Sequence, residues 1–189
     1  MVSAHCQKTD VSVIIPEKKI TVLIGANGSG KSTLLKALVR LLSPRSGYIY
    51  INGRNISEIG TKNLAQQLSM LPQSATAPGD LTVFDLLKQG RYPYHNLVSR
   101  WTKADEEITL QAIEKMGLAD IKDTRLSDLS GGQRQRAWIA LALAQNTDFF
   151  FLDEPTNHLN LKYQIEILGL LILSIKLEFV NYTCYIGTI

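Results

Sequence analysis

The chain of 189 residues has room for one domain, or for one domain with a subdomain. It is 45% hydrophobic and 20% charged, as globular proteins usually are, and its net charge of +3 is too small to indicate nucleic acid or an anionic membrane as a partner. Two cysteines near opposite ends argue against a disulfide framework and fit a reducing cytosol, and no apolar run is long enough for a signal peptide or a membrane span.

The first half of the chain predicts short strands around one helix. Runs of β-branched and apolar residues predict strands at residues 11–15, 20–24, 48–51 and 68–71. The run at 20–24 is near-continuously apolar, so we expect it to be buried on both faces of a sheet. Leucines at helical spacing predict a helix over residues 31–42, which the sequence SPRSG ends. The first ten residues predict no element, and we expect His5 to lie in a disordered terminus.

The second half predicts helices around one strand. Residues 82–89 and 104–117 predict helices, the second with Ile108, Ala112, Ile113 and Met116 facing inward and its acidic residues facing solvent. A helix over 133–145, a buried strand over 149–152 and a helix from Leu161 follow. This alternation predicts an α/β domain with a mainly parallel sheet, into which residues 82–130 are inserted as a helical subdomain.

The sequence GANGSGKST at residues 25–33 matches the pattern G-x-x-x-x-G-K-[ST], between a predicted strand and a predicted helix. In that context the pattern predicts a P-loop, whose backbone amides surround phosphates while Lys31 reaches the β- and γ-phosphates of a nucleotide. The alternative is a chance glycine turn. The predicted ATP-binding residues are Gly25, Ala26, Asn27, Gly28, Ser29, Gly30, Lys31, Ser32 and Thr33.

Acidic and amide side chains at strand ends are candidates for the chemistry. Asp153 and Glu154 end the run FFFLDE, and parallel sheets bind ligands at the carboxyl ends of their strands. Asp153 and Ser32 are predicted to hold Mg²⁺, and Glu154 to orient or deprotonate water. Gln73 also ends a strand and could touch Mg²⁺ or the attacking water, although a solvated loop glutamine is the simpler interpretation. The two acids could instead begin a turn before Pro155.

The stretch LSDLSGGQRQR places two glycines at the start of a predicted helix. The free N–H groups of a helix start favour an anion, Ser130 offers a hydroxyl, and Gly132 lets the backbone approach closely. The stretch therefore predicts an anion-binding segment.

Taken in order, the P-loop, the strand-end glutamine, LSGGQ and the Asp-Glu pair resemble the ABC ATPases over about residues 11–170. The resemblance implies one ABC ATPase domain over 1–189, with a P-loop core at 11–81 and 131–170 and antiparallel strands near its N-terminus. It also implies a head-to-tail dimer. The signature of one subunit, Ser130, Gly131, Gly132 and Gln133, would hold the γ-phosphate of ATP bound to the other.

Segments such as LTVFDLLKQGRYPY and WTKADEE narrow the resemblance to the ATPase subunits of iron-siderophore, haem and cobalamin importers. That resemblance implies hydrolysis of ATP with Mg²⁺, docking on a membrane permease through residues around 74–100, and no nucleic-acid partner. It also implies a peripheral location at the cytoplasmic face of the cell membrane. For the aromatic residues Tyr92, Tyr94 and Trp101 in that region, packing within the subdomain is an equal alternative.

The chain departs from the family pattern in three places. No aromatic residue precedes Gly25 to stack on adenine, Asn160 stands where the family has an aspartate, and no switch histidine follows His158. Residues 171–189 form an atypical tail, which implies that the strand expected there is missing and that the chain is truncated at both ends. Two alternatives stay open: a nucleotide-binding module with little or no catalysis, and a soluble ABC protein of translation or DNA repair.

Overall fold

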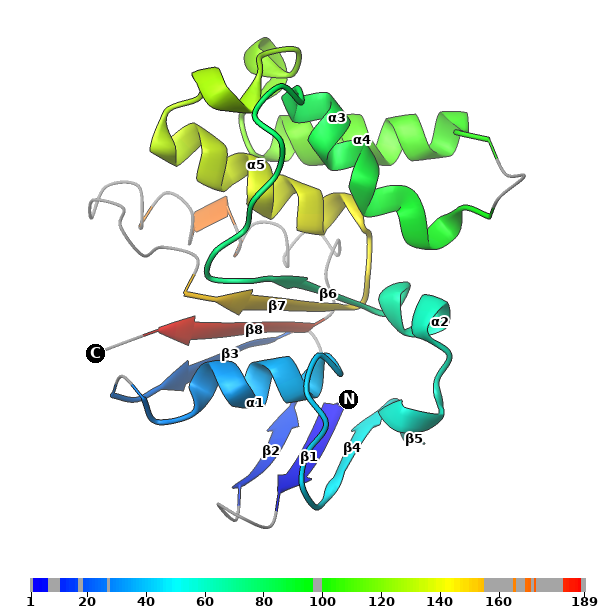
Figure 1. Cartoon of the computed structure of the whole chain (residues 1–189), viewed down its shortest axis with the longest axis vertical. Helices are drawn as coiled ribbons and strands as arrows, with labels where there is room; N and C mark the ends of the chain where they lie inside the picture. The colour runs from blue at the N-terminus through cyan, green and yellow to red at the C-terminus, as the bar shows by residue number, and fades with distance from the viewer. Residues whose placement is uncertain are drawn as a thin grey trace.

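The computed structural model describes residues 2–6, 11–16, 19–26, 28–96, 100–154, 165, 169–170, 172 and 182–187. These residues form a parallel sheet, an antiparallel sheet and a group of helices (Figure 1). The predicted α/β class is confirmed. Within the described part of the chain, no helix is both long and apolar enough to cross a membrane.

The parallel sheet has the strand order β3 (Lys19–Ile24), β8 (Tyr182–Gly187), β7 (Phe149–Asp153) and β6 (Leu68–Leu71). The expectation that the atypical tail lacks a core strand is wrong, because β8 lies between β3 and β7 and pairs in parallel with both. Its sequence YTCYIG is rich in aromatic and β-branched residues, which favour a strand whether or not a family pattern is present. Parallel pairing places the carboxyl ends of these strands at one edge of the sheet.

Strand β7 is buried on both faces, as predicted, and it divides the hydrophobic core into two clusters. Phe149 and Phe151 pack with Leu35 and Leu38 of helix α1 (Lys31–Leu38). On the other face, Phe150 packs into a cluster formed by the helices of the middle of the chain. Successive side chains of a strand point to opposite faces, so an all-apolar strand fills both clusters.

Strand β3 is not buried on both faces, contrary to our prediction. It lies at the edge of the parallel sheet, and only its Leu23 face packs against the α1 cluster. The side chains of Ile20, Val22 and Ile24 point the other way and are 39%, 47% and 60% exposed. An apolar sequence cannot distinguish a central strand from an edge strand, because that difference depends on its neighbours.

The antiparallel sheet has the order β2 (Val11–Ile15), β1 (Val2–Cys6), β4 (Tyr48–Ile51) and β5 (Arg54–Asn55), which confirms the predicted antiparallel strands. The prediction of a disordered N-terminus is wrong for residues 2–6, because β1 pairs with both β2 and β4. Those pairings supply the backbone hydrogen bonds that an isolated terminal segment would lack.

The helices are α1, α2 (Thr61–Ala65), α3 (Val83–Lys88), α4 (Lys103–Lys115) and α5 (Gly131–Ala144), with 3₁₀ turns η1 (Ile56–Glu58), η2 (Gln89–Tyr94), η3 (Ala119–Ile121) and η4 (Leu126–Asp128). Figure 1 shows α5 between the pair α3 and α4 and the parallel sheet. Helix α1 ends four residues before the predicted position at Leu42. Arg40 there has a positive φ of 59°, and its guanidinium donates to the carbonyl oxygens of Ile56 and Ile59.

One acidic residue of α4 is buried, although we predicted that all of them face solvent. Asp105 is only 5% exposed and accepts hydrogen bonds from Arg91 Nε at 3.0 Å and from Thr102 N at 3.0 Å. It also forms the capping box of α4 with Thr102, and His95 Nε2 lies 3.3 Å from its second oxygen. The charge of Arg91, distant in sequence from α4, makes this burial possible.

The stability of the protein should depend on Asp105 at low pH. Burial alone would raise the pKa of Asp105, but hydrogen bonds from Thr102 and Arg91 outweigh it and hold that pKa below its ordinary value. The resulting stabilisation is complete above the unfolded-state pKa, about 3.9, and is lost as the pH falls through the folded-state pKa. In urea unfolding between pH 5 and 2.5, the wild type should therefore lose more free energy of unfolding than Asp105→Asn. The control Asp120→Asn changes an exposed carboxylate and should behave as the wild type. Equal losses of unfolding free energy in all three proteins would show that the Asp105 carboxylate does not stabilise the fold.

Candidate functional site

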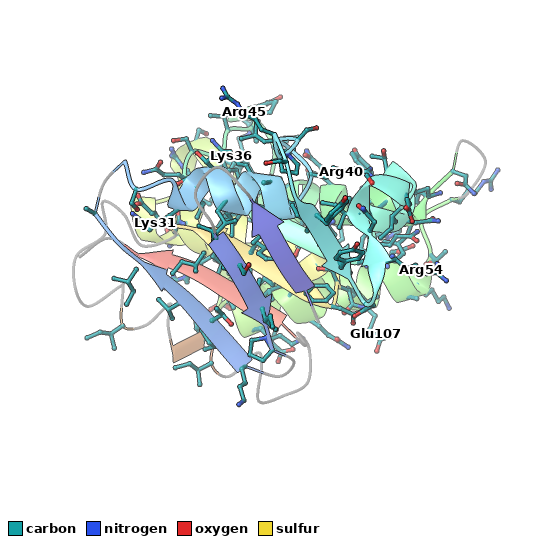
Figure 2. The ribbon with its side chains drawn as sticks, turned by 90° about the horizontal axis from the view of Figure 1, so that it is seen from below. Lys31, Lys36, Arg40, Arg45, Arg54 and Glu107 are labelled. Carbon is teal, nitrogen blue, oxygen red and sulfur yellow. The ribbon has the colours of Figure 1, made fainter. Side chains whose placement is uncertain are left out.

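The predicted P-loop joins the end of β3 to the start of α1. Gly28 and Gly30 have φ values of 80° and 90°, a left-handed conformation that favours glycine, and Gly30 is the N-cap of α1. Lys31 Nζ donates to the carbonyl oxygens of Gly25 at 2.7 Å and Ala26 at 2.9 Å, so the ammonium folds back over the turn. Figure 2 shows Lys31 at the N-terminal end of α1, near the ends of β3 and β8.

The remaining predicted phosphate-binding residues follow the same turn. Ser29 N donates to Ala26 O at 3.2 Å and closes it, and Thr33 lies exposed in the first turn of α1. Asn27 lies outside the described residues. The free N–H groups at the start of α1 and the positive end of its dipole make this turn suitable for an anion.

The two predicted Mg²⁺ ligands Ser32 and Asp153 meet across the site. Ser32 Oγ donates to Asp153 Oδ1 at 2.8 Å, although the residues are 121 positions apart. Asp153 is 1% exposed at the carboxyl end of β7. In the described part of the chain no three His, Cys, Asp or Glu side chains cluster as a metal site. One hydroxyl and one carboxylate suit Mg²⁺ that takes its other oxygen ligands from phosphate and water.

The two predicted catalytic side chains also meet. Gln73 Nε2 donates to Glu154 Oε2 at 2.6 Å, across 81 positions of sequence. Gln73 follows β6, and Glu154 follows β7, the neighbouring strand. Glu154 has a positive φ of 50°, which is uncommon for a residue with a side chain and is found at functional turns. The structure therefore favours a shared site for Gln73 and Glu154 over a glutamine that contacts only solvent.

The predicted anion-binding segment opens helix α5. Ser130 is its N-cap: Ser130 Oγ accepts from Gln133 N at 3.3 Å, and Gln133 Oε1 accepts from Ser130 N at 2.9 Å. This capping box leaves Ser130 and Gly131 exposed at the surface. Figure 1 shows the start of α5 on the same side of the molecule as the carboxyl ends of β7 and β8.

Removing the N-cap hydroxyl of α5 should weaken this helix start. We expect Ser130→Ala to lower the free energy of unfolding by about 0.5–2 kcal/mol, since one backbone donor loses its partner. Urea unfolding measures the difference. Ser127→Ala, which removes an exposed hydroxyl outside any helix N-cap, is the matched control and should cost less. Equal values for the two variants would show that the capping box contributes nothing.

Sequence reasoning missed a second group of functional interest, the buried pair formed by Arg91 of η2 and Asp105 of α4. A weak signal was available: Gly90 precedes Arg91 in a helical region, and glycine there permits a close backbone approach. Nothing in the local pattern indicated which partner approaches.

The site has a glycine turn between the parallel strand β3 and helix α1, and the first serine of α1 bonds to an aspartate at the end of β7. This arrangement defines the P-loop nucleotide-binding fold. The sequence model of the family described as "ABC transporter" matches residues 8–157. The chain belongs to the ABC transporter family, as the LSGGQ segment and its order among the motifs predicted.

Similar proteins of known name include ATP-binding subunits of siderophore systems. The chain is 52% identical over 162 residues to the "Probable siderophore transport system ATP-binding protein YusV" of Bacillus subtilis. It is 46% identical over 162 residues to the ferric enterobactin transport ATP-binding protein FepC of Escherichia coli. Each alignment covers 86% of this chain, which spans 59% and 60% of the length of these two relatives. A solved structure described as a metal-chelate type ABC transporter in an inward-facing conformation has a TM-score of 0.82, with 28% identity, over 100% of this chain and 72% of that one.

Proposed function

We propose that this chain binds and hydrolyses ATP and so powers an importer of the iron-siderophore type. One observation carries most of the proposal: the pairs Ser32–Asp153 and Gln73–Glu154 meet beside the phosphate-binding turn. The relatives that are 46–52% identical are named for siderophore and enterobactin transport, which supports this class of cargo.

In the proposed binding step, the N–H groups of residues 25–33 surround the phosphates of ATP. Lys31 exchanges its two carbonyl partners for the β- and γ-phosphate oxygens, a stronger, charge-assisted interaction. Ser32 and Asp153 would hold Mg²⁺, which neutralises charge developing on the phosphates. Asp153 is suited to this role because its buried carboxylate already has the serine hydroxyl beside it.

In the proposed chemical step, water attacks the γ-phosphorus and the bond to the β–γ bridging oxygen breaks, giving ADP and phosphate. Glu154 accepts the proton of the attacking water, and Gln73 orients that water at the γ-phosphate. Gln73 must release Glu154 before the carboxylate can take the proton. If the Gln73 amide moves from the carboxylate to the γ-phosphate, Glu154 becomes free to accept a proton only when ATP is bound.

The proposed partners are a second ATPase subunit and a membrane permease at the cytoplasmic face of the membrane. Ser130, Gly131, Gly132 and Gln133 would complete the site of the second subunit, and the exposure of Ser130 and Gly131 in the single chain supports this. In the proposed permease surface around residues 74–100, Tyr92 is 68% exposed and free to take part. By contrast, Tyr94 donates to Asn146 O at 3.0 Å and Trp101 stacks on His95, which supports a packing role for both.

The test measures phosphate release and ATP-dependent stabilisation on the purified chain. If the proposal is right, Mg-ATP raises the unfolding temperature and phosphate accumulates continuously beyond one equivalent per subunit. ATP-dependent stabilisation without release would leave only a nucleotide-binding module. Absence of both effects would refute the proposal, and co-purification with ribosomes in place of a membrane permease would refute the assigned partner.

A further inference from the structure

Arg91 joins the segment between α3 and α4 to the C-terminal end of helix α5. It is 5% exposed, and its Nε donates to Asp105 Oδ1 at 3.0 Å. Its Nη1 donates to the carbonyl oxygens of Ala144 at 3.1 Å and Gln145 at 3.3 Å, which end α5. The last carbonyls of a helix lack partners within the helix. A buried cation there donates hydrogen bonds to them and interacts favourably with the negative end of the helix dipole.

Two neighbours of Arg91 hold the same helix end. A Cβ atom at Gly90 would lie 2.7 Å from Leu141 O, so only glycine lets this backbone pack against α5. The Tyr94 ring centroid lies 3.9 Å from Arg91 Cζ, and Tyr94 Oη donates to Asn146 O at 3.0 Å. We call this group, made of Gly90, Arg91, Tyr94, Asp105 and the carbonyls of residues 144–146, the α5 clasp.

The α5 clasp lies at the opposite end of α5 from the capping box of Ser130. Helix α5 has 14 residues and is therefore about 20 Å long, and the chain runs from its C-terminal end into β7 and Asp153. Helix α5 packs against α3, α4 and β6, and releasing its C-terminal end should let the helix shift and let its backbone hydrogen bonds open more often. The position of the N-terminal end of α5 thus depends on the α5 clasp.

We propose that Arg91 is a positioning residue: through the α5 clasp it fixes α5 so that Ser130 and Gly132 reach the nucleotide of the partner subunit. The inference rests on the proposed function, because it gives the start of α5 a role only in an ATPase dimer. The planar guanidinium is required, since one side chain must reach the Asp105 carboxylate and two carbonyls together. Arg91 does not touch nucleotide and acts only through α5.

The experiment must distinguish the effect of Arg91 on the position of α5 from its effect on the stability of the fold. Arg91→Met alone leaves the Asp105 carboxylate buried without its cation and should lower the unfolding temperature by about 10 °C. The double variant Arg91→Met/Asp105→Asn removes both charges, while the asparagine can still accept the Thr102 hydrogen bond of the capping box. We expect it to unfold between Arg91→Met and the wild type, because the carbonyls of Ala144 and Gln145 still lose their donor. Glu107→Gln, which neutralises an exposed carboxylate on α4, is the control.

Two measurements on the double variant report whether α5 is still held in place. Amide hydrogen exchange at residues 134–137, in the N-terminal half of α5, should be about tenfold faster than in the wild type, because the helix is released at its far end. At saturating ATP, kcat should fall by about tenfold or more, while the ATP concentration needed for half-maximal stabilisation stays unchanged. Glu107→Gln should change neither quantity.

A double variant that matches the wild type in both exchange and kcat would overturn the proposal, because Arg91 would then be only half of a structural pair. An equal increase in exchange in Glu107→Gln would overturn it as well. If the wild type releases no phosphate, the proposed function fails on its own. The exchange readout still decides in that case whether Arg91 fixes the start of α5.

Discussion

Glu154→Gln is expected to lower steady-state phosphate release by about 10²–10⁴-fold and to leave ATP binding intact. The amide has the shape of the carboxylate and can still accept a hydrogen bond from Gln73, but it cannot accept a proton from water. Phosphate release measures the loss. The shift in unfolding temperature with Mg-ATP, measured on the same preparation, reports binding.

The matched control for this prediction is Glu107→Gln, which makes the same change on the exposed face of α4 (Figure 2). It should release phosphate at the wild-type rate. If Glu154→Gln keeps more than about a tenth of the wild-type rate, the proton is taken by another group and the role assigned to Glu154 is wrong.

Lys31→Ala is expected to abolish the stabilisation that ATP gives to the wild type. A ligand at a hundredfold excess over its Kd raises the free energy of unfolding by about 2.7 kcal/mol, provided that it binds only the folded state. Alanine at position 31 removes the charge that we propose faces the β- and γ-phosphates. Thermal unfolding of wild type and variant at one ATP concentration therefore measures whether the P-loop binds nucleotide.

Without ATP, Lys31→Ala should unfold close to the wild-type temperature, because the hydrogen bonds described for its ammonium go to the carbonyl groups of Gly25 and Ala26 in its own turn. Lys36→Ala removes an exposed lysine five positions further along α1 and is the control (Figure 2). It should retain the full ATP shift. An unchanged ATP shift in Lys31→Ala would place nucleotide at another site on the chain.

Features that depend on a few neighbouring residues were predictable from sequence. The glycines and Lys31 at fixed spacing predicted the strand–turn–helix unit, and Ser130 before two glycines predicted the start of α5. The unbroken apolar run at 149–152 predicted a strand buried on both faces. Turn geometry, helix capping and side-chain periodicity act over about ten residues or fewer, so the amino-acid order contains them directly.

Two strands near the ends of the chain were not predicted, one at each end. Residues 171–189 match no family pattern, yet β8 enters the middle of the parallel sheet. The first residues were predicted to be disordered, yet β1 pairs on both sides. In both places the missing information was which distant strands offer free backbone hydrogen-bonding groups.

The sequence by itself determined the glycine turn before α1, the glycine-rich start of α5 and the order of the motifs. Only the tertiary structure decided which side chains meet. It paired Ser32 with Asp153 and Gln73 with Glu154, and it left β3 at a sheet edge. It also buried Asp105, a residue whose charge alone predicts a surface position, because Arg91 arrives from another segment with the matching charge. Burial of a charge and closure of a site depend on partners far away in sequence, and folding alone brings them into contact.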